Sequence, residues 1–106
     1  MISSEFPAIP SPDTRLAIVG DFPRDHETSA CRPFAGPNLM YLEKALARSG
    51  LMRANCLVTN ICRSQPPKTY GKQPSSFFMF DGPDIQEGLA LLRSDFAQFS
   101  PNCVLL

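Results

Sequence analysis

Apolar positions along the chain gather in three runs that are too short to be helices. They cover residues 15–19, 55–59 and 103–106, and each is bounded by a proline, a glycine or an asparagine. A buried helix needs at least about ten residues, whereas four to eight apolar residues are typical of a buried strand in a parallel sheet. The pattern therefore predicts three buried strands, with Cys56 and Cys103 as buried thiols within two of them.

Two longer segments carry apolar residues at the three-to-four spacing of an amphipathic helix. The first runs from Asn38 to Ser49, and Gly50 is expected to cap its end. The second starts at Asp84, where Asp84 and Glu87 have capping-box spacing, and the Ser100-Pro101 pair breaks it. The apolar positions are Leu39, Leu42 and Leu46 in the first helix, and Ile85, Leu89, Leu92 and Phe96 in the second.

The order of these elements predicts an α/β fold, a parallel sheet with helices as crossovers. Residues 1–14 are rich in proline and serine and are expected to form an arm, which leaves residues 15–106 as the domain. Three strands have open edges, and the last apolar run has nothing after it to cover it. We therefore expect an incomplete fold, with a homo-oligomer or a second chain as the partner that completes the sheet.

Polar residues concentrate directly after the first strand. Gly20-Asp21-Phe22-Pro23-Arg24-Asp25-His26-Glu27 follows Val19, and Arg32-Pro33-Phe34-Ala35-Gly36 comes shortly afterwards. Ligands of open α/β sheets bind at the carboxyl ends of the strands. Asn60 ends the second strand, so it lies beside the first loop if the two strands are parallel neighbours. We expect Phe34 and Asn60 to lie within reach of one another across a cleft.

Composition narrows the class of protein. Ten basic and ten acidic side chains cancel, so there is no global basic field for nucleic acid, although a local patch would suffice. The apolar runs are too short to span a membrane, and Met1 to Thr14 does not resemble a secretory signal. The four cysteines lack Cys-x-x-Cys spacing and are expected to be reduced structural thiols, neither disulfides nor metal ligands. The sequence thus predicts a cytoplasmic protein.

Several motifs in register carry a resemblance to a known family. The segments Gly20 to Glu27 and Arg32 to Gly36, followed by the pairs Gly50-Leu51, Thr59-Asn60 and Pro66-Pro67, resemble the uracil-DNA glycosylase superfamily. Their spacings are closest to family 4 of that superfamily and match it without a gap from Gly20 to Pro67. The resemblance covers residues 15–106 and implies the amino-terminal half of a three-layer uracil-DNA glycosylase-like domain.

The resemblance implies that the substrate is DNA containing uracil and that the reaction is hydrolysis of the N-glycosidic bond of deoxyuridine, in base excision repair. Phe34 would stack on the flipped base, and Asn60 would hydrogen-bond its Watson-Crick edge and exclude cytosine. Asp21 and Glu27 would orient water or favour the cationic sugar. By the same resemblance Gly20 and Pro23 would help to bind substrate, and weaker candidates for contacts to phosphates are Arg63, Lys68 and Lys72.

Each of these residues also has a purely structural interpretation. Phe34 could anchor the core, and Asn60 could cap the turn after its strand. Asp21 could accept backbone N–H groups in its own loop, while Glu27 could form an ion pair with Arg24 or Arg32. The apolar residues 77–80 could either cap the core or form a binding surface.

This chain departs from the family pattern at several positions. Phe22 and Arg24 stand where the family has a small residue and usually a glycine, so they would partly fill the pocket. Family 4 proteins hold an iron-sulfur cluster on four cysteines, and Ser64 occupies one of those positions here, so no cofactor is expected. The family's second motif, a His-Pro-Ser segment, is absent, and His26 is the only histidine. We therefore expect weak or no glycosylase activity from this chain alone, with a base-binding or protein-interaction module on the same fold as the alternative.

Overall fold

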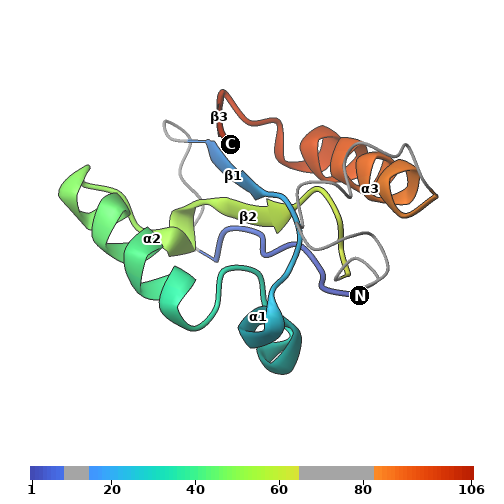
Figure 1. The fold of residues 1–106 in the computed structure, drawn as a ribbon. Helices are drawn as coiled ribbons and strands as arrows, with labels where there is room; N and C mark the ends of the chain where they lie inside the picture. The colour runs from blue at the N-terminus through green and yellow to red at the C-terminus, as the bar shows by residue number, and fades with distance from the viewer. Residues whose placement is uncertain (9–14, 65–82) are drawn as a thin grey trace.

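The fold is built on a small parallel sheet, as the sequence predicts. The computed structural model describes residues 1–8, 15–64 and 83–106. Its strands are β1 (Leu16–Gly20), β2 (Leu57–Asn60) and β3 (Cys103–Leu105), all parallel and in the order β2-β1-β3 (Figure 1). The central strand β1 is thus the first in the chain, and the path moves from it to one neighbour and then across to the other.

Helices cover the sheet on both faces and make three layers. The two long ones are α2 (Pro37–Arg48) and α3 (Pro83–Phe99), on either side of the strands in Figure 1. Two shorter turns, the helix α1 (Asp25–Ala30) and the 3₁₀ turn η1 (Arg53–Asn55), lie in the connections. Among the residues that the structure describes, the core accordingly has two parts. One contains Leu16, Ile18, Leu46, Cys56 and Val58, and the other contains Phe22, Cys62 and Ile85.

Gly50 ends α2 as predicted. It has a φ of +74°, and the N–H groups of Gly50 and Leu51 donate to the carbonyls of Ala47 and Leu46 at 3.1 and 2.8 Å. This pair of bonds is a Schellman motif, which satisfies carbonyls that the helix end leaves open. Leu51 also packs against the cluster that contains Leu46. The motif therefore turns the chain back toward the sheet.

The first residues of the expected arm pack along the sheet. Glu5 pairs with Val58 in an antiparallel bridge, and each N–H donates to the other residue's carbonyl at 2.8 Å. Ile2 is buried, and its N–H donates to the carbonyl of Arg63 at 2.6 Å. Residues 1–8, here called the amino-terminal segment, therefore lie along the sheet and pair with β2 at Glu5. Residues 9–14 lie outside the described part of the chain.

Two local expectations differ from the structure. Cys103 was expected to be buried, but all three residues of β3 are exposed. The reason is that β3 pairs with β1 along one edge only, whereas the main core clusters form around β1 and β2. Residues 25–30 were expected in a loop and instead form α1, which is too short to show helical apolar periodicity.

Some predictions fall on residues outside those described. These are the apolar patch at 77–80, the Pro66-Pro67 pair and the side chain of Asp84, so the capping box stays a prediction. Within the described ranges, no helix is long and apolar enough to cross a membrane.

Candidate functional site

Three residues of the predicted site meet at the carboxyl end of the sheet. Gly20 and Asn60 are partners in the register of β1 and β2, so both face the same side. A β-carbon placed on Gly20 would overlap Oδ1 of Asn60 and would lie 2.9 Å from Cζ of the Phe34 ring. Phe34 and Asn60 are therefore brought together, as expected, and they can approach this closely because residue 20 has no side chain.

A cavity of about 440 Å³ opens beside this meeting point. It lies between the carboxyl ends of β1 and β3, at the point where the order of strands along the sheet reverses, which is the usual ligand position in open α/β sheets. Its volume suits a small organic group. The lining residues are Ile18, Val19, Gly20, Asp21, Phe34, Leu42, Leu105 and Leu106. A second cavity, of about 520 Å³, is lined by neither Gly20 nor Phe34, and Asn60 lines neither of the two cavities.

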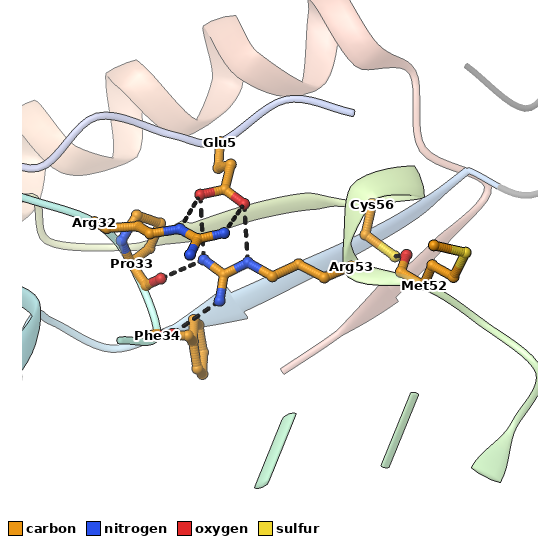
Figure 2. Close-up of polar contacts among 7 residues, drawn as sticks. All are labelled: Glu5, Arg32, Pro33, Phe34, Met52, Arg53 and Cys56. Carbon is orange, nitrogen blue, oxygen red and sulfur yellow. Dashed lines mark hydrogen bonds and ion pairs between the residues drawn. The ribbon is translucent and has the colours of Figure 1, made fainter. Parts of the chain in front are cut away.

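Phe34 is held in an unusual backbone conformation. Its φ of +51° is in the left-handed region, which residues with a side chain rarely adopt. The guanidinium of Arg53 donates to the carbonyls of Pro33 and Phe34 at 2.5 and 2.8 Å (Figure 2). Arg53 is only 6% exposed. A buried cation thus stabilises the turn that carries the Phe34 ring.

Glu5 completes this cluster from the amino-terminal segment. Its carboxylate accepts from Nε and Nη2 of Arg32 at 2.7 and 3.0 Å and from Nε of Arg53 at 2.9 Å (Figure 2). The hydrogen bond from Arg32, and then those from Arg53, outweigh burial and lower the pKa of Glu5 from 4.5 to about 2. The guanidinium of Arg32 therefore forms its ion pair with Glu5. Sequence reasoning missed both Glu5 and Arg53.

The two candidate acids are placed very differently. Asp21 lines the cavity with its side chain about half exposed. Its Oδ1 accepts from the N–H of Phe22 at 2.7 Å and its Oδ2 from Arg24 at 3.2 Å, so the structural interpretation of this residue holds in part. Glu27 is 3% exposed within α1 and is not among the residues that line this cavity. Asp21 is thus the acid that can meet a ligand there.

Phe22 and Arg24 do not fill the cavity, contrary to expectation. Phe22 is buried against Cys62 and Ile85, in the part of the core next to α3. The guanidinium of Arg24 lies 4.0 Å from the centre of the Phe22 ring and pairs with Asp21. Pro23, predicted to bind substrate, is fully buried. The large side chains of the loop after β1, Phe22 and Arg24, are therefore not among the residues that line the cavity.

Arg63 is not available as placed to contact a DNA phosphate. It is 7% exposed, and its Nη2 donates to Asp95 at 2.7 Å. Its Nε donates to the backbone carbonyl of Asn60 at 3.1 Å. The expected phosphate contact is therefore corrected to a structural one, because α3 supplies a carboxylate for this cation. Lys68 and Lys72 lie outside the described residues.

The cysteines do not fit a four-thiolate cluster. Cys56 and Cys62 are buried in different parts of the core, and Cys31 and Cys103 are exposed. Burial raises the pKa of the Cys56 thiol, which disfavours the thiolate that a metal would need. In the described ranges, no three side chains of His, Cys, Asp or Glu gather as a metal site. The absence of a cofactor stays a prediction.

Comparisons with known proteins give one consistent family. The family model described as Uracil DNA glycosylase superfamily matches residues 6–106. A type-4 uracil-DNA glycosylase of Thermotoga maritima is 34% identical over 62 residues, which are 58% of this chain and 32% of that protein. A type-4 uracil-DNA glycosylase of Pyrobaculum aerophilum is 40% identical over 52 residues, 49% of this chain and 26% of that protein. The matches thus span about a third or less of these curated relatives.

Proposed function

This chain belongs to the uracil-DNA glycosylase superfamily, and we propose that it hydrolyses the N-glycosidic bond of deoxyuridine in DNA. The chain would catalyse this hydrolysis together with a further segment or a partner chain that supplies the rest of the domain. The observation that carries this proposal is the convergence of Phe34 and Asn60 above Gly20, beside a cavity of about 440 Å³. An aromatic face and an amide edge are what recognition of an unstacked base requires.

In this proposal Phe34 stacks on the flipped uracil and Asn60 reads its edge. In one orientation of the Asn60 amide, its oxygen accepts from N3–H of uracil and its N–H donates to O4, and in that orientation it mismatches cytosine. Asn60 is 5% exposed and its backbone carbonyl accepts from Arg63, so its position at the end of β2 is well fixed. Gly20 has no side chain, and this lets the Phe34 ring and the Asn60 amide lie close together at the edge of the cavity.

Asp21 is the proposed catalytic carboxylate for hydrolysis. As the bond between C1′ and N1 breaks, its electron pair leaves with uracil and positive charge develops on the sugar. An ionised Asp21 at the cavity wall would stabilise that charge and orient water, whose oxygen then bonds to C1′. The water loses one proton as its oxygen bonds to C1′, and the departing uracil anion takes up a proton, so the products are free uracil and a sugar with a hydroxyl group on C1′. Glu27 would support α1, since it lies outside the cavity lining.

The edge of β3 is the proposed place for a completing chain. Val104, Leu105 and Leu106 are exposed apolar residues there, and Leu105 and Leu106 also line the cavity. A strand added at this edge would cover them and close the site from that side. A cytoplasmic location is part of the same proposal.

The test uses the 106-residue chain and two single-stranded oligonucleotides that differ by one base, uracil or cytosine. Binding is measured by fluorescence anisotropy and base release by alkaline cleavage. We expect preferred binding of the uracil strand, weakened roughly tenfold or more by Phe34→Leu, because base stacking on an aromatic ring is worth about 1–3 kcal/mol. Asn60→Ala should remove the preference over cytosine. Tyr41→Ala, an exposed aromatic position on α2, is the control.

The outcomes separate the alternatives. Base release that Asp21→Asn abolishes would support hydrolysis. Uracil-specific binding without base release would support the base-binding site, and hydrolysis would then require the completing segment or partner chain. Equal binding of both strands, or a preference that survives both Phe34→Leu and Asn60→Ala, would contradict the site.

A further inference from the structure

We propose that Glu5 is a positioning residue for Phe34, which it fixes above Gly20 by holding the guanidinium of Arg53. The consequence for uracil binding rests on the proposed function, whereas the positioning of the ring does not. Glu5 lies one residue before the range that the family model matches, so this contact is not part of what the family comparison identifies.

Arg53 is a buried link between two segments. On one side its Nε and Nη2 bind the Glu5 carboxylate at 2.9 and 3.3 Å. On the other side its Nη1 and Nη2 bind the consecutive carbonyls of Phe34 and Pro33. A guanidinium has five donors in a fixed plane, so fixing one edge fixes the other. The position of Glu5 therefore determines where the Phe34 backbone is held.

The turn at Phe34 needs such support. Its left-handed backbone is unfavourable for a residue with a side chain, and it persists only where surrounding contacts enforce it. Without Arg53, the carbonyls of Pro33 and Phe34 would lose their hydrogen-bond donor. Arg53 is buried at this site. The ring is also tightly placed, because its Cε2 and Cζ lie 3.2 and 2.9 Å from the β-carbon position of Gly20. Small movements of the turn would therefore change the base-binding space.

Glu5 connects the turn at Phe34 to β2, the strand that carries Asn60. Its N–H and carbonyl pair with Val58, two residues before Asn60 on β2. The path from Asn60 to Phe34 thus runs along β2 to Glu5, then through Arg53 to the turn. Arg32, which precedes Pro33 in the chain, also binds the Glu5 carboxylate. We infer that this path sets the spacing between the aromatic face and the amide edge.

The first test measures the ring position by NMR, without substrate. Phe34→Leu in the folded protein defines how far the resonances of the Gly20 α-protons and the Asn60 side-chain amide move when the ring current is lost. We expect Glu5→Gln to move the same resonances a large part of that distance. Glu43→Gln removes one carboxylate near Arg32 and should leave them in place. Unchanged resonances in a folded Glu5→Gln protein would overturn the proposal.

A double-mutant cycle tests the consequence for the uracil oligonucleotide. Glu5→Gln should weaken its binding roughly tenfold, the scale of one lost hydrogen bond to a charged group. In the Phe34→Leu background the same change should have little further effect, whereas additive losses would contradict positioning through Phe34. Glu5→Asp, which keeps the charge on a shorter side chain, should lie between wild type and Glu5→Gln in both tests and replaces Glu5→Gln if that protein does not fold. A wild-type chain without preference for uracil would contradict the proposed function, while the NMR test would still decide the role of Glu5.

Discussion

At the scale of single residues, the site depends on Gly20 having no β-carbon. The Phe34 ring and the Asn60 amide occupy the space where one would be. The backbone of Gly20 is not in the left-handed region, so the requirement for glycine here is one of space and not of conformation. A substitution at this position therefore acts directly on the two side chains proposed to bind the base.

Gly20→Ala should separate Phe34 from Asn60. The added methyl group overpacks the site, which costs about 1–3 kcal/mol and should weaken uracil binding roughly ten- to a hundredfold. The measurement is the anisotropy titration together with the free energy of unfolding in urea. Combining Gly20→Ala with Phe34→Leu removes the ring atom at 2.9 Å, so the loss of stability should then be smaller. An equal loss in both backgrounds would mean that the ring is not the obstacle.

The residue scale also shows which parts of the site could be predicted from sequence. Phe34 and Asn60 were predicted correctly to meet, because strand ends in a parallel sheet share an edge. Glu5 and Arg53 could not be predicted, because an ion pair between residues 48 positions apart leaves no local pattern. Arg63 was predicted as a weak phosphate contact because a charged residue in a loop is usually exposed, whereas its partner Asp95 lies on α3, far away in the sequence. Whether Phe34, Asn60 and Asp21 have the proposed roles stays a prediction.

At the scale of elements, local signals explain what was predicted well. The end of α2 was predicted to within a residue because Gly50 alone can adopt the required turn at low cost. The helix α1 was missed because six residues hold no periodicity. The exposure of β3 was missed because its apolar composition indicates burial, whereas its place at the edge of the sheet decides the outcome. Elements were thus predictable where their cause was local.

Close packing of α3 on the sheet gives a prediction at this scale. A β-carbon on Gly88 would overlap the carbonyl oxygen of Ile61, which follows β2. Gly88→Ala should therefore destabilise the protein by about 1–3 kcal/mol, although alanine favours a helix by about 1 kcal/mol. Urea unfolding measures the change, and Ser94→Ala at an exposed position of α3 is the control. A more stable Gly88→Ala protein would mean that α3 does not lie this close to the chain after β2.

At the scale of the whole molecule, the amino-terminal segment joins both sides of the sheet. Ser4 Oγ lies 2.7 Å from Oγ1 of Thr59 on β2 and also donates to Asp95 on α3. The next residue, Glu5, binds the two arginines beside the Phe34 turn. Neighbouring residues of an extended segment point to opposite faces, so one short segment can contact both networks. The turn at Phe34 and the helix α3 are therefore connected through residues 4 and 5.

The dependence of stability on acidic pH should test the ion pairs that Glu5 forms in this segment. The pKa of Glu5 is about 2 in the folded protein against an ordinary 4.5, so its ionised form favours folding. This contribution is complete above pH 4.5 and is lost as the pH falls toward 2. The urea midpoint of wild type should therefore fall more steeply over this range than that of Glu5→Gln, and Glu43→Gln should follow wild type. Parallel curves for wild type and Glu5→Gln would contradict the low pKa.

The bridge between Glu5 and Val58 also matters for anyone who expresses this protein. A gene trimmed to the range recognised by the family model would begin at residue 6 and would encode every residue of the Gly20, Phe34 and Asn60 site. It would nevertheless discard Ile2, Ser4 and Glu5, which contribute a buried side chain and partners for both networks. Borders for cloning should therefore be drawn from the sheet and its edge pairing, since a shortened protein could carry every recognised motif and still hold its aromatic ring in the wrong place.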